Sequence, residues 1–258
     1  MRATLATQRY NWEQGTVAQA FLETGETEIA VQMAVEAVNR QIEDGRCAQV
    51  GPPESSTDPC GIGEALIFAC ETTGDPALIE GRDRLLDWAL HRAPRSERGV
   101  VYHLESSRQF WVDSLYMLPP FLARAGYVKE AMLQINGWWD ALFDPQTRLL
   151  AHIWDDGAKT FIRSAKWGVG NGWAAAGLTR VIGMLPEGDT QRNTLVDRVT
   201  RLLHTAFQYH IPPELLPVLP LTYQPLIHAS ARSASVIAAT SLSERAVPSL
   251  LNQVQSSA

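Results

Sequence analysis

An aspartate lies inside an apolar, aromatic run at residues 110–117, Phe-Trp-Val-Asp-Ser-Leu-Tyr-Met. An ionised carboxylate is costly to surround with hydrocarbon unless a partner or a function compensates. If the run is a helix, one face holds a single acid against aromatic rings; the residues on that face are Phe110, Asp113, Tyr116 and Met117. The simpler alternative is an aspartate that caps the first turn of a helix and touches solvent. The first reading predicts acid–base chemistry, and the second predicts only a helix start.

A glycine-rich string between two tryptophans is the second feature that suggests chemistry. Residues 167–173 read Trp-Gly-Val-Gly-Asn-Gly-Trp. The glycines allow the backbone to approach a ligand, and the indole rings of Trp167 and Trp173 are flat apolar surfaces that can stack on sugar rings. The alternative is a glycine-rich helix entry with Trp173 in the core. The string is not a dinucleotide fingerprint, because its glycine spacing is wrong and no strand is predicted before it.

Other polar residues have a plain alternative beside the functional one. Asp58 precedes a helical pattern and is either a site carboxylate or an N-cap. His103 and His152 fall near predicted loops, where a lone histidine is usually a surface or hydrogen-bonded residue. With no third ligand at metal spacing, we expect no metal site. The three cysteines have no CxxC spacing and are expected to be free thiols.

The elements that must position these residues are helical. Glycines at 25, 74, 126 and the pair 183 and 188 interrupt helical patterns at intervals of roughly fifty residues, a period typical of repeated two-helix units. Apolar residues on both sides recur at helical spacing, and β-branched alternation is scarce. We therefore expect about ten or eleven helices, little sheet, and a tight glycine turn within each antiparallel pair.

The longer connections fall between the pairs, at residues 44–57, 93–108, 144–166 and 211–228. Because each hairpin returns the chain to its starting level, these connections lie at one end of the array, where function is expected. Most of the unusual polar and aromatic residues fall at that end. Hairpins repeated around an axis can close into an α/α toroid with a central pocket. We predict one all-α toroid domain over residues 1–258, either a complete ring or one that lacks parts of its ends.

Composition excludes several classes of partner. A formal charge of −6 and a pI near 5.5, with no Lys/Arg run, argue against nucleic acid and against an anionic membrane surface. No apolar stretch is long enough to span a bilayer, and the first ten residues lack the apolar core of a secretory signal. As the sequence stands, this predicts a cytoplasmic protein, or a secreted one if a longer start has been removed.

Four strings together resemble a known family. They are residues 11–15 (Asn-Trp-Glu-Gln-Gly), Asp58 before residues 61–66 (Gly-Ile-Gly-Glu-Ala-Leu), residues 111–117 (Trp-Val-Asp-Ser-Leu-Tyr-Met) and residues 167–173. The set is similar to the unsaturated glycuronyl hydrolases, most of all the unsaturated rhamnogalacturonyl hydrolases of glycoside hydrolase family 105, which are related to family 88. The likeness runs from about Tyr10 to Leu185. It implies an α/α toroid of six helical hairpins, in agreement with the repeat pattern.

The resemblance implies an unusual hydrolysis that needs no cofactor. These enzymes hydrate the C4=C5 double bond of a terminal unsaturated uronic acid, and the resulting hemiketal opens and releases the next sugar. By resemblance, Asp113 donates the proton and then helps to deprotonate water, and Asp58 is the second carboxylate, which holds sugar hydroxyls and raises the proton affinity of the first. The expected substrate is a small oligosaccharide. The predicted substrate-binding residues are Trp12, His103, Trp111, His152, Trp167, Asn171 and Trp173.

Departures from the family pattern keep other functions open. Many relatives have arginine where Val169 stands, and Lys166 or Arg163 is the expected substitute. Parts of both family ends lack counterparts, and residues 228–233 only loosely resemble a family site segment. An open seam in the ring would expose apolar surface that a homodimer could cover. The alternative function is a non-hydrolytic protein that binds or modifies small molecules in the same pocket. A conventional two-carboxylate glycosidase is the third candidate.

Overall fold

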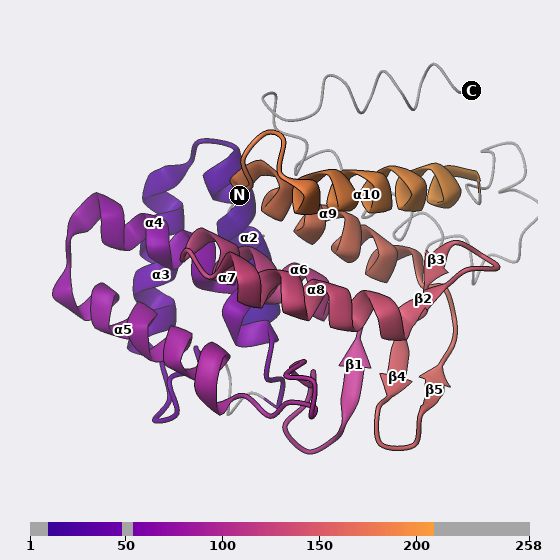
Figure 1. The fold of residues 1–258 in the computed structure, drawn as a ribbon. Coiled ribbons are helices and arrows are strands. Elements are labelled where there is room, and N and C mark those ends of the chain that lie inside the picture. Colours follow the sequence, from indigo (N-terminus) through magenta and orange to yellow (C-terminus); the bar gives the residue numbers. More distant parts are fainter. Residues whose placement is uncertain (1–9, 48–53, 209–258) are drawn as a thin grey trace, which may run out of the picture.

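The computed structural model describes residues 10–47 and 54–208, and every structural statement below concerns these residues. They are mostly helical, with short strands gathered at the lower right of Figure 1, where α8 ends and α9 begins. The helices are α2 (Asn11–Glu23), α3 (Thr27–Asn39), η1 (Asp58–Ile62), α4 (Gly63–Thr73), α5 (Pro76–Asp87), η2 (Trp88–Arg92), α6 (Ser114–Met117), α7 (Pro119–Arg124), α8 (Val128–Leu142), α9 (Gly168–Met184) and α10 (Thr190–Gln208). The strands are β1 (Gln109–Trp111), β2 (Phe143–Asp144), β3 (Leu149–Leu150), β4 (Ile153–Asp155) and β5 (Thr160–Arg163).

Tight glycine turns join the helices into antiparallel hairpins, as predicted. Gly25, Gly74, Gly126 and Gly188 follow α2, α4, α7 and α9, and each has a positive φ, between 64° and 91°. A residue with a Cβ is disfavoured in this left-handed region, so the turns depend on glycine. The prediction was less exact for Gly183, which is an exposed residue inside α9 and takes no part in the turn. The predicted repeats are therefore confirmed within the described residues.

The hairpins form two layers. Helices α2, α4, α7 and α9 are neighbours in that order, and each contacts its own second helix, α3, α5, α8 or α10. Helix α9 is buried at every position from residue 170 to 182, whereas much of α10 is exposed or half-buried. A helix that is apolar on all sides belongs inside, and an amphipathic helix covers it. The described part of the chain is thus an α/α arrangement, with the first helices of the hairpins on the inside.

Two glycines let inner elements touch backbone to backbone. A Cβ added to Gly177 in α9 would lie 2.1 Å from the carbonyl oxygen of Leu115 in α6. A Cβ added to Gly15 in α2 would lie 2.4 Å from the carbonyl carbon of Gly61 in η1. Both distances are shorter than atoms can approach without movement. Because α6 follows Asp113 and η1 begins at Asp58, these contacts fix the backbone of both candidate carboxyl residues.

The run at residues 110–117 is not a single helix. Residues 109–111 form β1, which pairs antiparallel with β4, while β4 also pairs with β5. The chain then turns at Val112, whose N–H donates to the carbonyl of His152 (3.1 Å), and α6 begins after Asp113. The predicted shared helix face is therefore wrong. The capping alternative is wrong as well, because Asp113 occupies the N-cap position but its side chain makes no cap hydrogen bond.

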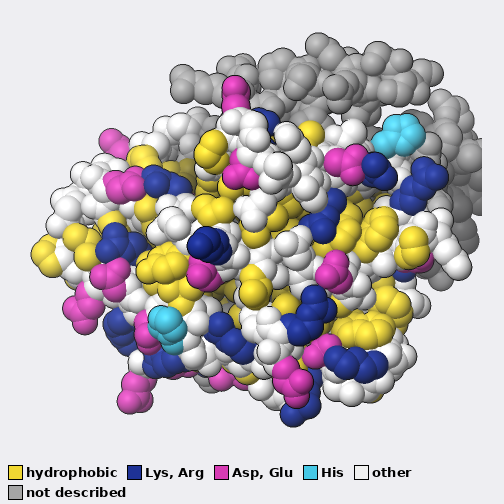
Figure 2. Space-filling model, in the orientation of Figure 1, with side chains coloured by type: hydrophobic (Ala, Val, Ile, Leu, Met, Phe, Trp, Pro, Cys, Tyr) yellow, Lys and Arg dark blue, Asp and Glu magenta, His cyan; other side chains and the backbone are white. Residues whose placement is uncertain are grey.

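The face seen in Figure 2 mixes Lys and Arg with Asp and Glu, and it shows no continuous basic patch. No helix among the described residues is both long and apolar enough to cross a membrane. The predicted connection at 211–228 and the segment at 228–233 lie outside the described residues.

The glycine contact at Gly177 can be tested within one helix. We expect Gly177→Ala to lower the free energy of unfolding by about 1–3 kcal/mol or more, because the new methyl group meets the α6 backbone. Gly183→Ala is the matched control. No atom lies within 4 Å of its added Cβ, so it should be neutral or up to about 1 kcal/mol more stable. Urea unfolding of both variants measures the difference, and equal stabilities would contradict the packing argument.

Candidate active site

A chain of aromatic rings runs through the place where the long connections meet. The imidazole of His103 stacks on the indole of Trp111, with ring centroids 4.5 Å apart and planes 15° apart. Trp111 meets His152 edge-on at 5.6 Å, and His152 lies 4.6 Å from Trp167. These rings come from the loop before β1, from β1 itself, from the residues before β4, and from the start of α9. The topology thus gathers four of the predicted substrate-binding side chains.

Each candidate carboxyl group faces one imidazole. Asp58 Oδ1 lies 4.0 Å from His103 Nε2, and Asp113 Oδ2 lies 3.8 Å from His152 Nε2. Both distances are too long for a hydrogen bond. The two oxygen atoms are buried, and within the described residues neither has a hydrogen-bond partner. An unsatisfied buried acceptor is costly, so these atoms are expected to be satisfied when a ligand or water enters.

Burial governs the protonation of all four groups. It raises the pKa of Asp113 to about 6, and burial together with the charge of Asp113 raises the pKa of Asp58 to about 7. Burial lowers the pKa of His103 to about 3 and that of His152 to about 4. The imidazoles are therefore neutral at neutral pH, and neither short contact is an ion pair. The two carboxyls interact and titrate together, and the higher pKa falls on Asp58, not on Asp113 as expected.

The second pair of predicted tryptophans, Trp12 and Trp173, are in contact with each other. Trp173 is 6% exposed and packs edge-on against Tyr116 at 4.5 Å, in a small buried cluster with Met117. Trp12 meets Trp173 edge-on at 6.3 Å and is 36% exposed. Tyr116 is only three residues after Asp113, so this cluster adjoins the acid-bearing turn. Substrate stacking by Trp12 and Trp173 remains a prediction.

The side chain of Asn171 makes hydrogen bonds to backbone groups. Its amide N–H groups donate to the carbonyls of Leu150 and Trp167, both at 3.0 Å, and its oxygen accepts from the Leu150 N–H at 2.9 Å. With 4% of its surface exposed, it ties β3 to the start of α9. The structure therefore gives Asn171 a positioning role for Trp167, and its predicted contact with substrate has no support from this geometry.

One of the two expected cations is already paired. Lys166 Nζ lies 3.2 Å from Asp144 Oδ2. Arg163, at the end of β5, has no ion-pair partner in the described part of the chain. The strand register pairs Trp111 with Ile153 and Ile153 with Arg163, so all three side chains leave the same face of the sheet. The positive charge of Arg163 also lowers the pKa of His152, after burial. Arg163 is therefore the better placed cation.

Sequence reasoning missed two hydroxyl residues at the site. Thr57 and Ser114 are fully buried, and both contact His103 Nδ1. Their only sequence signal is their position next to Asp58 and Asp113.

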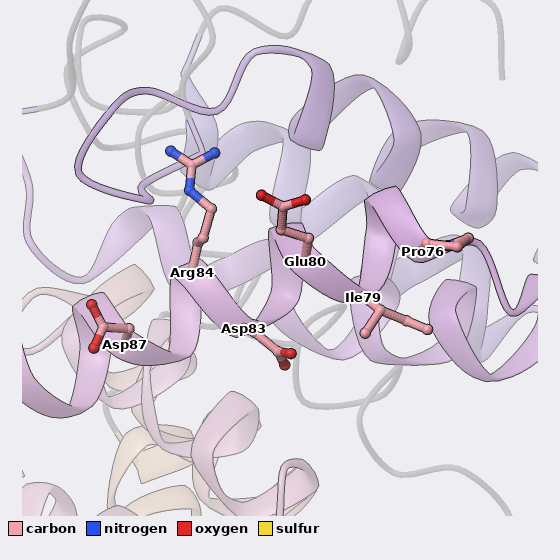
Figure 3. A pocket seen from close by; sticks show the side chains of 6 residues that line it. All are labelled: Pro76, Ile79, Glu80, Asp83, Arg84 and Asp87. Atoms are coloured by element: carbon pink, nitrogen blue, oxygen red, sulfur yellow. The ribbon is translucent and has the colours of Figure 1, made fainter.

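The open hollow in Figure 3 contains none of the predicted residues. It is lined by α5 side chains alone: Pro76, Ile79, Glu80, Asp83, Arg84 and Asp87.

Comparisons with known proteins find relatives in sequence and in fold. The model of Glycosyl Hydrolase Family 88 matches residues 2–211. An unsaturated rhamnogalacturonyl hydrolase of Bacillus subtilis (strain 168) is 30% identical over 193 residues, which are 68% of this chain and 54% of that protein. The chain thus spans about half the length of this curated relative.

Solved structures share the fold at low sequence identity. A family 105 glycoside hydrolase of C. acetobutylicum ATCC 824 superimposes with a TM-score of 0.66 and 18% identity, covering 88% of this chain and 77% of that one. The unsaturated glucuronyl hydrolase of Bacillus sp. GL1 gives 0.61 and 15%, covering 79% and 63%. The predicted α/α toroid fold of the six-hairpin glycosidases is confirmed.

The raised pKa of Asp58 predicts a pH-dependent cost of folding. Below pH 3.8, the ordinary pKa of aspartate, the carboxyl is protonated in both the folded and the unfolded state, and its burial carries no penalty from ionisation. As the pH rises, the unfolded chain loses this proton first, so the free energy of unfolding falls until about pH 7, where the folded carboxyl also ionises. We expect Asp58→Asn to gain stability over the wild type from pH 4 to pH 7, by at most about 1.4 kcal/mol per pH unit.

Asp75→Asn is the matched control, because its carboxylate is exposed and an asparagine can still accept the Ala77 N–H at the start of α5. Chemical unfolding at several pH values checks both variants. Parallel curves for Asp58→Asn and the wild type over this range would contradict the account of the buried carboxyl.

Proposed function

Because this chain belongs to glycosyl hydrolase family 88, we propose that it hydrolyses oligosaccharides that end in an unsaturated uronic acid. The observation that carries the proposal is the pair of buried carboxyls, each facing a neutral imidazole that packs against an indole ring. Their raised pKa values keep a proton available near neutral pH, as acid catalysis requires. The expected reaction is hydration of the C4=C5 double bond.

The proposed chemistry uses one acid twice. Asp113 protonates C4, and as a carboxylate it then assists the addition of water at C5. The hemiketal that results opens and releases the neighbouring sugar. A pKa of about 6 suits both roles, because neither form of the carboxyl is scarce near neutral pH. Asp58 interacts with Asp113 electrostatically: the negative charge of Asp113 raises the pKa of Asp58 to about 7, so Asp58 can keep its proton after the acid has lost its own.

We infer that Arg163 receives the carboxylate of the uronic acid. Its side chain leaves the sheet on the Trp111 face, and it has no ion-pair partner among the described residues. Val169, at the position where many relatives carry arginine, packs on the buried cluster of Tyr116 and Trp173. A guanidinium binds a carboxylate through two parallel hydrogen bonds, so one free arginine is sufficient for this recognition.

We further propose a rhamnogalacturonan-derived disaccharide as the preferred substrate. The support is the name of the Bacillus subtilis relative, an unsaturated rhamnogalacturonyl hydrolase. The second candidate is a protein that binds such a sugar without hydrolysing it. Val169 favours this alternative, because the string at 167–173 supplies no cation. Turnover and binding measured on the same disaccharide separate the two.

Substitution of the acid tests the proposed reaction. We expect Asp113→Asn to lower the rate of loss of the double-bond ultraviolet absorbance by about 10²- to 10⁴-fold, the usual contribution of a general acid. The thermal midpoint should be unchanged or higher, because a buried carboxyl is removed. Retained turnover in this variant would refute the assignment.

Asp58→Asn is the matched comparison. Asparagine is neutral, as Asp58 mainly is while Asp113 titrates, so the midpoint of Asp113 and the alkaline limb of the pH–rate profile should change little. If Asp58→Asn abolishes turnover while Asp113→Asn retains it, the two roles are reversed.

The role of Arg163 is tested by the affinity for substrate. Arg163→Gln should raise KM for the unsaturated disaccharide by about tenfold or more, since a charged hydrogen bond contributes about 1.5–3 kcal/mol, and kcat should change less. Lys166→Gln is the control, because that ammonium already pairs with Asp144. A larger rise in KM for Lys166→Gln would assign the carboxylate to Lys166 instead.

A further inference from the structure

Three buried polar atoms form a closed triangle between the two carboxyl-bearing segments. Thr57 Oγ1 lies 2.9 Å from His103 Nδ1, Ser114 Oγ lies 3.0 Å from the same nitrogen, and the two hydroxyl oxygens are 3.2 Å apart. Thr57 and Ser114 are 0% exposed, and His103 is 4% exposed. Thr57 directly precedes Asp58, and Ser114 directly follows Asp113. One imidazole nitrogen thus joins the two segments.

The imidazole ring is fixed in place by contacts outside the triangle. It stacks on Trp111 with planes only 15° apart. The backbone N–H of His103 donates to the Gln109 carbonyl at 2.8 Å, and the His103 carbonyl accepts from the Ser56 N–H at 2.7 Å. With the ring held, Nδ1 always faces the two hydroxyls and Nε2 always faces Asp58. What the hydroxyls determine is which nitrogen carries the proton.

Counting protons decides between the two neutral forms. Each hydroxyl has one proton to donate, and in the described part of the chain neither has an acceptor outside the triangle. If Nδ1 is bare, one hydroxyl donates to it and the other donates to the first hydroxyl oxygen, so every proton is used. If Nδ1 carries the proton, one hydroxyl proton is left buried without an acceptor, which is unfavourable. Burial keeps the ring neutral, because it lowers the pKa of His103 to about 3.

We propose that Thr57 and Ser114 are positioning residues that hold His103 in the form protonated at Nε2, with that N–H directed at the unpaired oxygen of Asp58. The catalytic meaning of this assignment rests on the proposed function. The 4.0 Å gap then has a donor on one side and an acceptor on the other. A hydroxyl group in the gap accepts from His103 and donates to Asp58. With a bare Nε2 and an ionised Asp58, it would have two acceptors and no donor.

Nitrogen NMR reads the proton position directly and does not depend on turnover. In the full chain labelled with ¹⁵N-histidine, two-bond ¹H–¹⁵N spectra distinguish Nδ1–H from Nε2–H, and the His103→Gln spectrum identifies the signals of His103. We expect Nε2–H with a hydrogen-bonded, bare Nδ1 at pH 7, and no protonation of the ring down to about pH 5. A proton on Nδ1 would overturn the proposal, even if the protein turns over its substrate.

Variants test whether the hydroxyls are the cause. Either hydroxyl alone can donate to Nδ1, so Thr57→Val and Ser114→Ala should each keep the Nδ1 hydrogen bond. The double variant should lose it, and its kcat/KM should fall at least about tenfold further than the product of the two single losses. Thr57→Ser keeps the hydroxyl and should keep the wild-type spectrum. Losses that simply multiply, with Nδ1 unchanged in the double variant, would overturn the proposal.

Discussion

The burial of two carboxyl groups, each with one oxygen that lacks a hydrogen-bond partner in the described part of the chain, is the constraint on which the rest of this structure depends. Asp58 Oδ1 and Asp113 Oδ2 are both inaccessible and unpaired in the described residues. Each such atom costs about 1–3 kcal/mol when nothing satisfies it. A fold can keep this arrangement only if the backbone around it has no conformation of lower free energy. The same burial moves both pKa values toward neutrality, so the cost to stability and the capacity for acid catalysis have one origin.

Backbone contacts around the site fix the two segments that carry the carboxyl groups. Direct packing at Gly15 and Gly177 places η1 and α6 against inner helices, with no side chain between. The Val112 N–H bond to the His152 carbonyl ties the acid-bearing turn to the strand that follows. The triangle of Thr57, His103 and Ser114 then joins the two carboxyl segments to each other. Movement of one carboxyl would therefore disturb the other.

The fold was predictable where the signals are local. Helical spacing and the glycine turns at Gly25, Gly74, Gly126 and Gly188 lie within each hairpin, and the loop end of the array follows from hairpin geometry. Strand β1 was missed because its partner β4 lies about forty residues away, and no local pattern announces that pairing. The same pairing explains why Asp113 lies at a junction and not on a helix face. The role of Asn171 depends on Leu150, which lies 21 residues away in the sequence.

The central claim is that burial, together with the charge of Asp113 acting on Asp58, raises the pKa values of both carboxyls toward neutrality. Titration of the ¹³C-labelled aspartate carboxyl carbons by NMR tests it most directly, with Asp58→Asn and Asp113→Asn identifying the signals. We expect coupled midpoints of about 6 and about 7 for this pair. Two carboxyls that both titrate close to 3.8, the ordinary value for aspartate, would contradict the account.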